Sequence, residues 1–146
     1  MGKFTTVVSI AIMIAFLAGT AIADIGRIKR VKGTASVERG GETLSATPGM
    51  VLEKQDVLVT GPDSRVSVTF IDNSRFSAGP DSRIVLETFD FDTTTHEGAF
   101  VSRVERGTLG IVSGQIAKQT PDAMRIHTPT SILGVRGTKF LVEVGQ

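Results

Sequence analysis

The chain has 146 residues, of which 40% are hydrophobic and 21% are charged, and this composition is that of one ordinary globular domain, which excludes a disordered or fibrous chain. It contains no Cys, Trp or Tyr, which excludes a disulfide framework and a thiolate metal site. The residues 1–23 contain one charged side chain, Lys3. Without them, the 16 Lys and Arg residues become 15 and equal the 15 Asp and Glu residues. A net charge of zero argues against electrostatic capture of nucleic acid, which needs a marked basic excess.

The first 23 residues have the pattern of a secretory signal peptide. Lys3 supplies a short positive region, residues 7–18 are apolar, and Ala21-Ile22-Ala23 is the small-x-small pattern that signal peptidase accepts before Asp24. The competing interpretation is an uncleaved membrane anchor, because the apolar stretch 7–23 has 17 residues and lies at the lower limit for spanning a bilayer. We expect a signal peptide helix over 1–23, a mature domain over 24–146, and a periplasmic or secreted location.

Beyond residue 24 the apolar residues alternate with polar ones, which is the period of a β-strand. Val66, Val68 and Phe70 follow this rule, as does the segment 139–144. Turn residues interrupt the pattern about every 8 to 12 residues, as they do in all-β domains. We predict a single all-β domain over 24–146, a compact roll or sandwich of short antiparallel strands with solenoid-like stacking. The choice between sandwich and solenoid stays open, because two repeated units are fewer than a stacked-repeat fold needs.

The five residues Gly-Pro-Asp-Ser-Arg occur at 61–65 and again at 79–83. Each copy directly precedes an alternating strand, so we interpret it as a turn that leads into a strand and not as a chemical site. Pro and Asp at the two central positions predict a type I turn. Asp and Arg two positions apart also predict an exposed ion pair within each copy, which contributes about 0 to 1 kcal/mol.

Two further turns are predicted from local residue types. Asp72-Asn73-Ser74 separates two apolar runs and predicts a tight hairpin in which Asn73 takes the left-handed conformation. The segments 37–40 and 104–107 both read Val-Glu-Arg-Gly, and we expect each to end a strand at a hairpin.

No local motif for catalysis or phosphate binding occurs, since the sequence has neither a GxxxxGK[ST] loop nor a GxSxG elbow. The best metal candidate is the acidic stretch 87–97, in which Asp90 and Asp92 share a strand face and Glu97 returns across a loop, but it lacks the spacing of a calcium loop. A metal-dependent hydrolase built on Asp90, Asp92 and His96 is therefore the least favoured function. His127 is assigned a structural role. We expect no enzyme, no cofactor and no metal.

A basic run near the start of the mature chain is the first candidate contact surface. It consists of Arg27, Lys29, Arg30 and Lys32. One interpretation is a solvated first strand. The other is a contact with anionic lipid or a cell-wall polymer, to which each such charge contributes about 1 kcal/mol.

Arg136 is the second candidate. It lies between Gly134 and Gly137, which allow the backbone to fold tightly around a guanidinium group with five hydrogen-bond donors. Two interpretations are open: a buried arginine that holds a turn, and a contact with a partner protein.

The segment Thr128-Pro-Thr-Ser-Ile-Leu-Gly-Val-Arg-Gly-Thr-Lys-Phe140 resembles the TP-x-A-x-x-GVRGT-x-F signature of the FecR protein domain, named for the ferric-citrate regulator. Other segments agree with the family in order: the early hairpin at 33–37, the block at 56–61, the strand at 66–74 and the strand at 109–114. The resemblance covers about residues 28–144. Asn73 stands where the family usually has glycine, and Ser131 stands where it usually has alanine.

The resemblance implies an extracytoplasmic all-β signalling domain that receives a signal from an outer-membrane transporter and passes it to a cytoplasmic sigma factor. Three residues before the apolar stretch are too few to hold a sigma factor, so we do not expect that role. Family members usually continue after Phe140 with another hairpin, which leaves two alternatives open: the sequence is a fragment, or the last strand is an unpaired edge. An unpaired edge invites strand addition by a partner, with Lys139, Leu141 and Glu143 as contacts. The leading function is a non-catalytic module that binds another envelope protein. The alternative is a cell-wall or carbohydrate binder that uses the basic run.

Overall fold

The computed structural model describes Gly2 and residues 23–145, so the expected signal peptide over 1–23 lies almost wholly outside the described residues. The described part contains twelve β-strands and one short α-helix, which confirms the predicted all-β fold. No helix in this part is long and apolar enough to cross a membrane. The elements are β1 (Gly26–Lys32), β2 (Ala35–Arg39), β3 (Glu42–Ser45), β4 (Val51–Leu52), β5 (Val57–Thr60), β6 (Arg65–Phe70), β7 (Arg75–Ala78), β8 (Arg83–Phe91), β9 (Gly98–Val112), α1 (Gln115–Gln119), β10 (Met124–His127), β11 (Ile132–Gly134) and β12 (Lys139–Val144).

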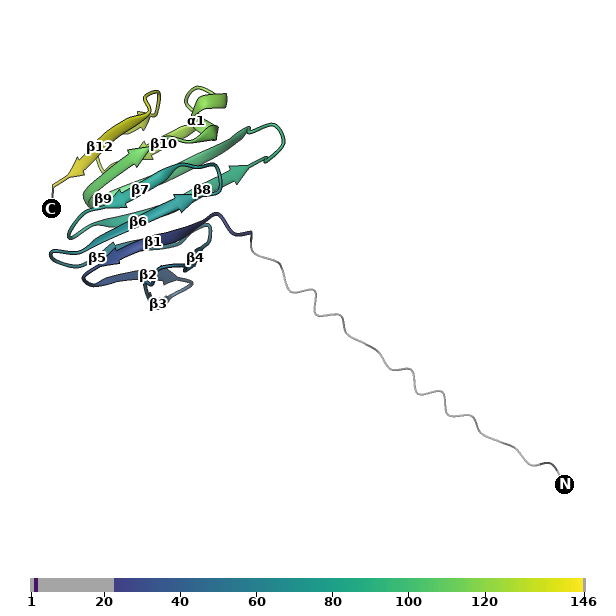
Figure 1. Ribbon diagram of the computed structural model, residues 1–146, viewed down its shortest axis with the longest axis horizontal. Helices are drawn as coiled ribbons and strands as arrows, with labels where there is room; N and C mark the ends of the chain where they lie inside the picture. The colour runs from purple at the N-terminus through teal and green to yellow at the C-terminus, as the bar shows by residue number, and fades with distance from the viewer. Residues whose placement is uncertain (1, 3–22, 146) are drawn as a thin grey trace.

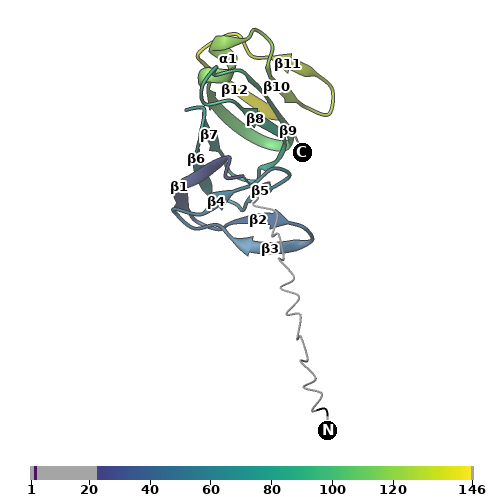
Figure 2. The same ribbon diagram turned by 90° about the vertical axis from the view of Figure 1, so that its right-hand side faces the viewer.

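The strands form one sheet that curls into a half-barrel (Figure 1). Its main path runs in the order β3-β2-β5-β8-β9-β7-β6-β1-β4, and β10 and β12 attach beside β9. We call layer A the strands β4, β1, β6, β7 and β12 with the second part of β9, and layer B the strands β3, β2, β5, β8, β10 and β11 with the first part of β9. Figure 2 shows β1, β6 and β7 on one side of the molecule and β8 and β9 on the other. The strand pairs are antiparallel except that β10 runs parallel to β9.

The repeated pentapeptide forms the corner at which the chain passes between the two layers. Residues 61–64 join β5 of layer B to β6 of layer A, and residues 79–82 join β7 of layer A to β8 of layer B. The amide of Asp81 donates to the carbonyl of Gly61 at 3.1 Å, so one corner stacks on the other. This stacking confirms both the interpretation of the repeat as a structural turn and the expected solenoid-like local arrangement.

The serine of each copy holds its corner in place. Ser64 Oγ accepts a hydrogen bond from the amide of Thr34 at 2.9 Å, and Ser82 Oγ accepts the equivalent bond from Thr108 at 2.9 Å. The predicted type I turn is wrong, because Asp63 has a φ of +52° and the Asp of the second copy has +51°. A positive φ at the second central position is the geometry of a type II turn, and Asp is among the residues that tolerate it.

Strand β9 crosses the same corner without a break and so belongs to both layers. Gly107 lies at its bend with a φ of +89°, and a Cβ atom there would lie 2.2 Å from Ser82 Oγ. Only glycine fits this bend, since the conformation and the close approach both exclude a side chain. The prediction that Gly107 ends a strand at a hairpin is therefore wrong. With 15 residues β9 is also longer than the short strands that were expected.

The core lies between the two layers, and the alternating residues line it as predicted. Val66, Val68 and Phe70 of β6 are each 2% exposed. Burying a large apolar side chain stabilises the fold by about 1.5 to 3 kcal/mol. Phe70 is also part of an aromatic cluster with ring centroids 4.7 to 5.7 Å apart, whose other members are Phe76, Phe89 and Phe100.

The hairpin between β6 and β7 is confirmed, with Asn73 at a φ of +68°. Its neighbour Asp72 is fully buried, and its side chain accepts hydrogen bonds from the amide and the hydroxyl of Ser74 at 2.9 and 2.7 Å. The carbonyl of Asp72 also accepts the first amide of α1, from Gln115, at 2.7 Å. The hairpin thus caps a helix that the strand period did not predict.

Candidate partner-binding surfaces

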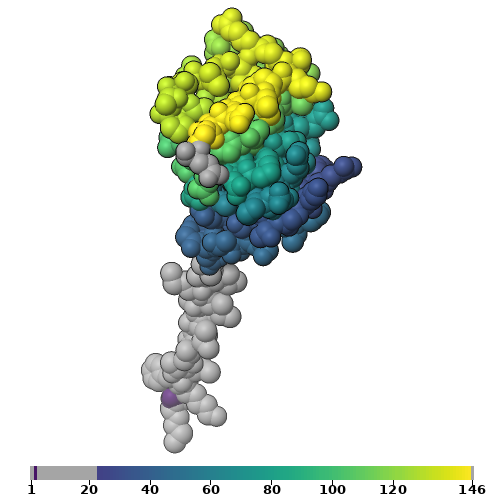
Figure 3. Space-filling view, turned by 90° about the vertical axis from the view of Figure 1, so that its left-hand side faces the viewer, coloured from purple at the N-terminus to yellow at the C-terminus, as the bar shows by residue number. Residues whose placement is uncertain are grey.

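Strand β12 lies at the edge of layer A. It pairs in register with β9 over residues 139–144, and within the described residues no second strand pairs with it. Val142 faces the core and is 5% exposed, whereas Leu141 is 67% exposed on the outer face. Figure 3 shows this C-terminal segment, in yellow, on the surface at the end of the molecule opposite the blue N-terminal strands. The expected edge strand is therefore present at the expected residues.

Strand β11 forms the corresponding edge of layer B. It pairs with β10, which in turn pairs with β9, so β11 and β12 lie beyond β9 at the same end of the half-barrel (Figure 2). Ile132 is 68% exposed and Leu133 is 40% exposed. Large apolar side chains gathered at one end of a domain are typical of a surface that another molecule covers.

Arg136 is on the surface. Its side chain is 75% exposed and forms a fork with Asp122, with Nε to Oδ1 at 3.3 Å and an Nη nitrogen to Oδ2 at 3.0 Å. The hydrogen bonds from Arg136 lower the pKa of the Asp122 carboxyl. Val135, not Arg136, anchors this loop, since Val135 is 2% exposed and its amide donates to the carbonyl of Met124 at 3.0 Å. The interpretation of Arg136 as a buried arginine is wrong, and its use by a partner stays a prediction.

The basic run lies on β1 at the outer face of layer A. The register of β1 against β6 shifts between Ile28 and Arg30, so Lys29 is the extra residue of a bulge and both it and Arg30 are exposed. Arg27 forms an ion pair with Asp24 at 3.3 Å. Lys29, Arg30 and Lys32 instead line a groove of about 450 Å³ whose other residues are Val31, Pro48, Arg65 and Ser67.

The acidic stretch is engaged with the protein itself. Asp90 pairs with Lys54, and Asp92 accepts hydrogen bonds from the amides of Thr94 and Thr95 at 2.8 and 3.1 Å, which lower the pKa of the Asp92 carboxyl. In residues 23–145 no group of three His, Cys, Asp or Glu side chains is placed to hold a metal ion.

Both histidines are half-buried among protein groups. The ring of His96 stacks on Phe91 with centroids 6.0 Å apart. His127 Nδ1 lies 3.6 Å from a carboxylate oxygen of Glu87, and the structural role expected for it agrees with this contact. Neither histidine lines a groove with the acidic residues of the hydrolase hypothesis, since the groove at the acidic loop is lined by Asp90, Phe91, Asp92, Thr93, Thr95, Glu97 and Gly98.

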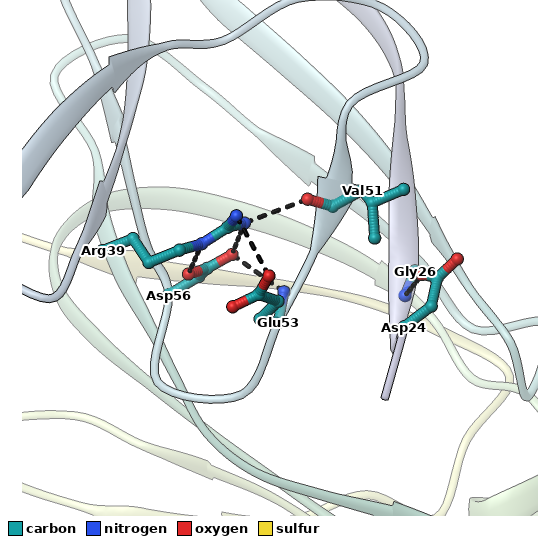
Figure 4. A network of polar contacts seen from close by, with 6 residues as sticks. All are labelled: Asp24, Gly26, Arg39, Val51, Glu53 and Asp56. Atoms are coloured by element: carbon teal, nitrogen blue, oxygen red, sulfur yellow. Dashed lines mark hydrogen bonds and ion pairs between the residues drawn. The ribbon is translucent and has the colours of Figure 1, made fainter. Parts of the chain in front are cut away.

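A polar network around Arg39 and Asp56 was not predicted from the sequence (Figure 4). The Asp56 carboxylate is fully buried and accepts two hydrogen bonds from Arg39, at 2.8 and 2.7 Å, and one from the amide of Glu53 at 2.8 Å. The hydrogen bonds between Arg39 and Asp56 raise the pKa of the Arg39 guanidinium. Arg39 also donates to the carbonyl of Val51 at 3.0 Å, so the network ties β2 to β4 and to the turn before β5. The signal in the sequence is that Asp56 directly precedes apolar strand residues, because a buried carboxylate needs a partner.

The described residues thus form an all-β domain with an exposed edge strand and a groove lined by basic residues. The FecR protein family model matches residues 56–146, and the chain belongs to this family. No curated protein and no solved structure matches the chain. Domains of this family are typically periplasmic sensing or signalling domains of anti-sigma regulators, and they are generally non-catalytic. The resemblance noted from the GVRGT segment is thereby confirmed.

Proposed function

We propose that this chain is a non-catalytic module of the cell envelope that binds another envelope protein through the edge of β12. The observation that carries the proposal is the exposed side of β12, which pairs with no second strand among the described residues. Membership of a family of periplasmic sensing domains supports a protein partner in the same compartment.

Strand addition explains how such an edge recognises a protein. The outer side of an edge strand presents amide and carbonyl groups that an extended segment of a partner can pair with, and alternate side chains then set specificity. On β12 these side chains are Lys139, Leu141 and Glu143, which place an apolar residue between a positive and a negative one. We therefore expect the partner segment to place an acidic residue beside Lys139, an apolar residue beside Leu141 and a basic residue beside Glu143.

The test is recovery of a partner by the tagged domain 24–146 from an envelope fraction. We expect one specific protein with the unaltered domain and at least about a tenfold weaker recovery with Leu141→Asp, because a buried charge would replace a central apolar contact. A deletion of 139–146 is less informative, since it would also remove Val142 from the core.

Ile71→Asp is the matched control. Ile71 is an exposed isoleucine, 45% accessible, beside the β6–β7 hairpin and away from β12. Its replacement should leave recovery unchanged. Equal recovery with Leu141→Asp and with the unaltered domain would contradict the use of β12, and recovery of no protein above background would contradict the protein-binding function.

A second candidate function is cell-wall or carbohydrate binding by the basic run. The observation in its favour is that Lys29, Arg30 and Lys32 converge on one groove with Arg65. Sedimentation with purified wall polymer tests it. Simultaneous neutralisation of Arg27, Lys29, Arg30 and Lys32 should abolish sedimentation, whereas the unaltered domain remaining in the supernatant would contradict this candidate.

A further inference from the structure

The outer face of layer A carries a longer feature than the basic run. Arg30 on β1 is in register with Ser67 on β6, which is in register with Ser77 on β7. Ser77 is in register with Gly110 on β9, and Gly110 with Leu141 on β12. Neighbouring strands are about 4.8 Å apart, so this row of mostly small residues crosses the five strands over a length of about 19 Å.

Two grooves adjoin along this row. The groove at β1 includes Ser67 in its lining, and a second groove of about 380 Å³ includes Ser77, which is the register partner of Ser67. The second groove is bounded by Arg75 and Lys139 and is otherwise lined by Gly110, Ile111, Val112 and Phe140. A path that runs from Arg30 and Arg65 in the first groove, past Ser67 and Ser77, to Arg75 and Lys139 in the second thus has cations at both ends.

The charges along this path are not neutralised by the protein. In the described part of the chain no ion pair forms at Arg30, Arg65, Arg75 or Lys139, and the one carboxylate among the outward residues of β12 is Glu143. A surface lined by one sign of charge attracts a ligand of the opposite sign and concentrates it.

The shape and chemistry of the path indicate the kind of anion. A linear chain that lies across the strands would contact the cations of both grooves. Seryl hydroxyl groups both donate and accept hydrogen bonds, as sugar hydroxyl groups do, and arginine forks match carboxylates.

We propose that the outer face of layer A binds a linear acidic polysaccharide, with its carboxylates held by Arg30 and Arg65 at one end and by Arg75 and Lys139 at the other. The sugar hydroxyl groups lie against Ser67 and Ser77. This inference extends the binding surface of the second candidate function from β1 to five strands. It rests on that candidate function for the contacts at β1 alone. It shares Lys139 with the proposed protein contact on β12, and the two proposals are tested with different ligands.

Binding of a length series of oligogalacturonates to the domain 24–146, measured by calorimetry at low salt, tests the proposal. We expect affinity to rise with oligomer length until the chain spans the path of about 19 Å, and to fall as salt screens the charges. A neutral glucan, inorganic polyphosphate and vesicles of anionic phospholipid are the comparison ligands. Polyphosphate or vesicle binding equal to that of the oligogalacturonate would overturn the ligand class.

Three variants test the path. Arg30→Gln with Arg65→Gln and Arg75→Gln with Lys139→Gln should each weaken binding roughly tenfold, since each removes two charge contacts. Ser77→Leu fills the middle of the path and should abolish the gain from longer oligomers while keeping both charged ends. The matched control is Arg106→Gln with Arg125→Gln, which removes two exposed positive charges from strands of layer B and should change affinity less than about twofold.

The outcomes separate the two hypotheses. No binding of oligogalacturonate by the unaltered domain would overturn this inference, and no sedimentation with wall polymer would overturn the second candidate. Binding that depends on Arg30 and Arg65 but not on Arg75, Lys139 and Ser77 would leave the second candidate standing and overturn the five-strand path. Far-ultraviolet circular dichroism of each variant checks that the fold is intact, and the exposed position of each substituted side chain supports this expectation.

Discussion

The outer faces of the two layers both carry arginine and lysine, but among the described residues most ion pairs lie on layer B, and Arg27 with Asp24 is the pair on β1 of layer A. On layer B, Arg83 forms a fork with Glu38 at 2.8 and 2.9 Å and also pairs with Glu105, while Arg103 pairs with Glu87. On layer A, within the described residues, Arg30, Arg65 and Arg75 face solvent without a carboxylate partner.

Residues 24–146 have a net charge of zero, but this difference shows that their positive charges are distributed unevenly between the two layers. Paired charges on layer B are used within the fold, where each pair stabilises the register of neighbouring strands. Unpaired charges of one sign on layer A repel one another and gain no ion pair from folding, and the proposed polysaccharide would neutralise them. The stability of variants on the two layers tests this division.

The largest effect is expected at the charge that is most deeply buried on the paired side. Asp56→Ala should lower the free energy of unfolding by about 3 kcal/mol, because it leaves Arg39 and the amide of Glu53 without their acceptor. Urea denaturation measures the loss. Asp90→Ala is the control, since the Asp90 side chain is 63% exposed and its loss should cost about 1 kcal/mol or less. Equal losses in the two variants would contradict a structural role for the Arg39–Asp56 network.

A smaller effect is expected from acid on the outer face of layer B. The hydrogen bonds from Arg83 hold the pKa of the Glu38 carboxyl below its ordinary value of 4.5. A carboxyl whose pKa is lowered by folding stabilises the protein above its ordinary pKa, and this stabilisation is lost as the pH falls through the lower value of the folded state. Glu38→Gln should therefore be less stable than the unaltered domain at pH 7 but lose less stability on acidification below pH 4.5. Parallel stability curves for the two proteins in that range would argue against the pairing.

The smallest effect on stability is expected on layer A. Arg30→Gln with Arg75→Gln should change the free energy of unfolding by no more than about 0.5 kcal/mol, because neither side chain has an ion-pair partner among the described residues. Arg83→Gln is the matched single substitution on layer B and should cost more, about 1 kcal/mol, since Arg83 joins two carboxylates. A larger loss on layer A than on layer B would reverse the division between the two faces.

Local patterns in the sequence were sufficient for the alternating strands and for the positions of the corners, whereas the edge strand was expected from the family resemblance. Alternation in β6 predicted its buried row, Asn73 predicted its own left-handed turn, and the repeat at 61–65 and 79–83 predicted two matched structural units. Each of these depends on residues within a few positions of one another, where backbone sterics and period decide the outcome.

The features that were missed depend on distant partners. The type of the corner turn could not be predicted, because Ser64 and Ser82 fix it by bonds to Thr34 and Thr108. Arg136 was open between a buried and an exposed position, because its partner Asp122 lies fourteen residues earlier in the chain. Likewise the basic run was visible at 27–32, but its continuation to Arg75 and Lys139 is created only by the register of five strands.

The stacked corners have a consequence for how this domain can change. An extra residue at the corner of 61–64 would turn the whole of β6 over, because adjacent side chains in a strand point to opposite faces. The loop between β8 and β9, by contrast, lies outside the core and starts and ends in exposed residues, so insertions there would lengthen a tip and leave both layers in place. Insertions at the stacked corners would thus disrupt the fold, whereas insertions in the loop between β8 and β9 would be tolerated.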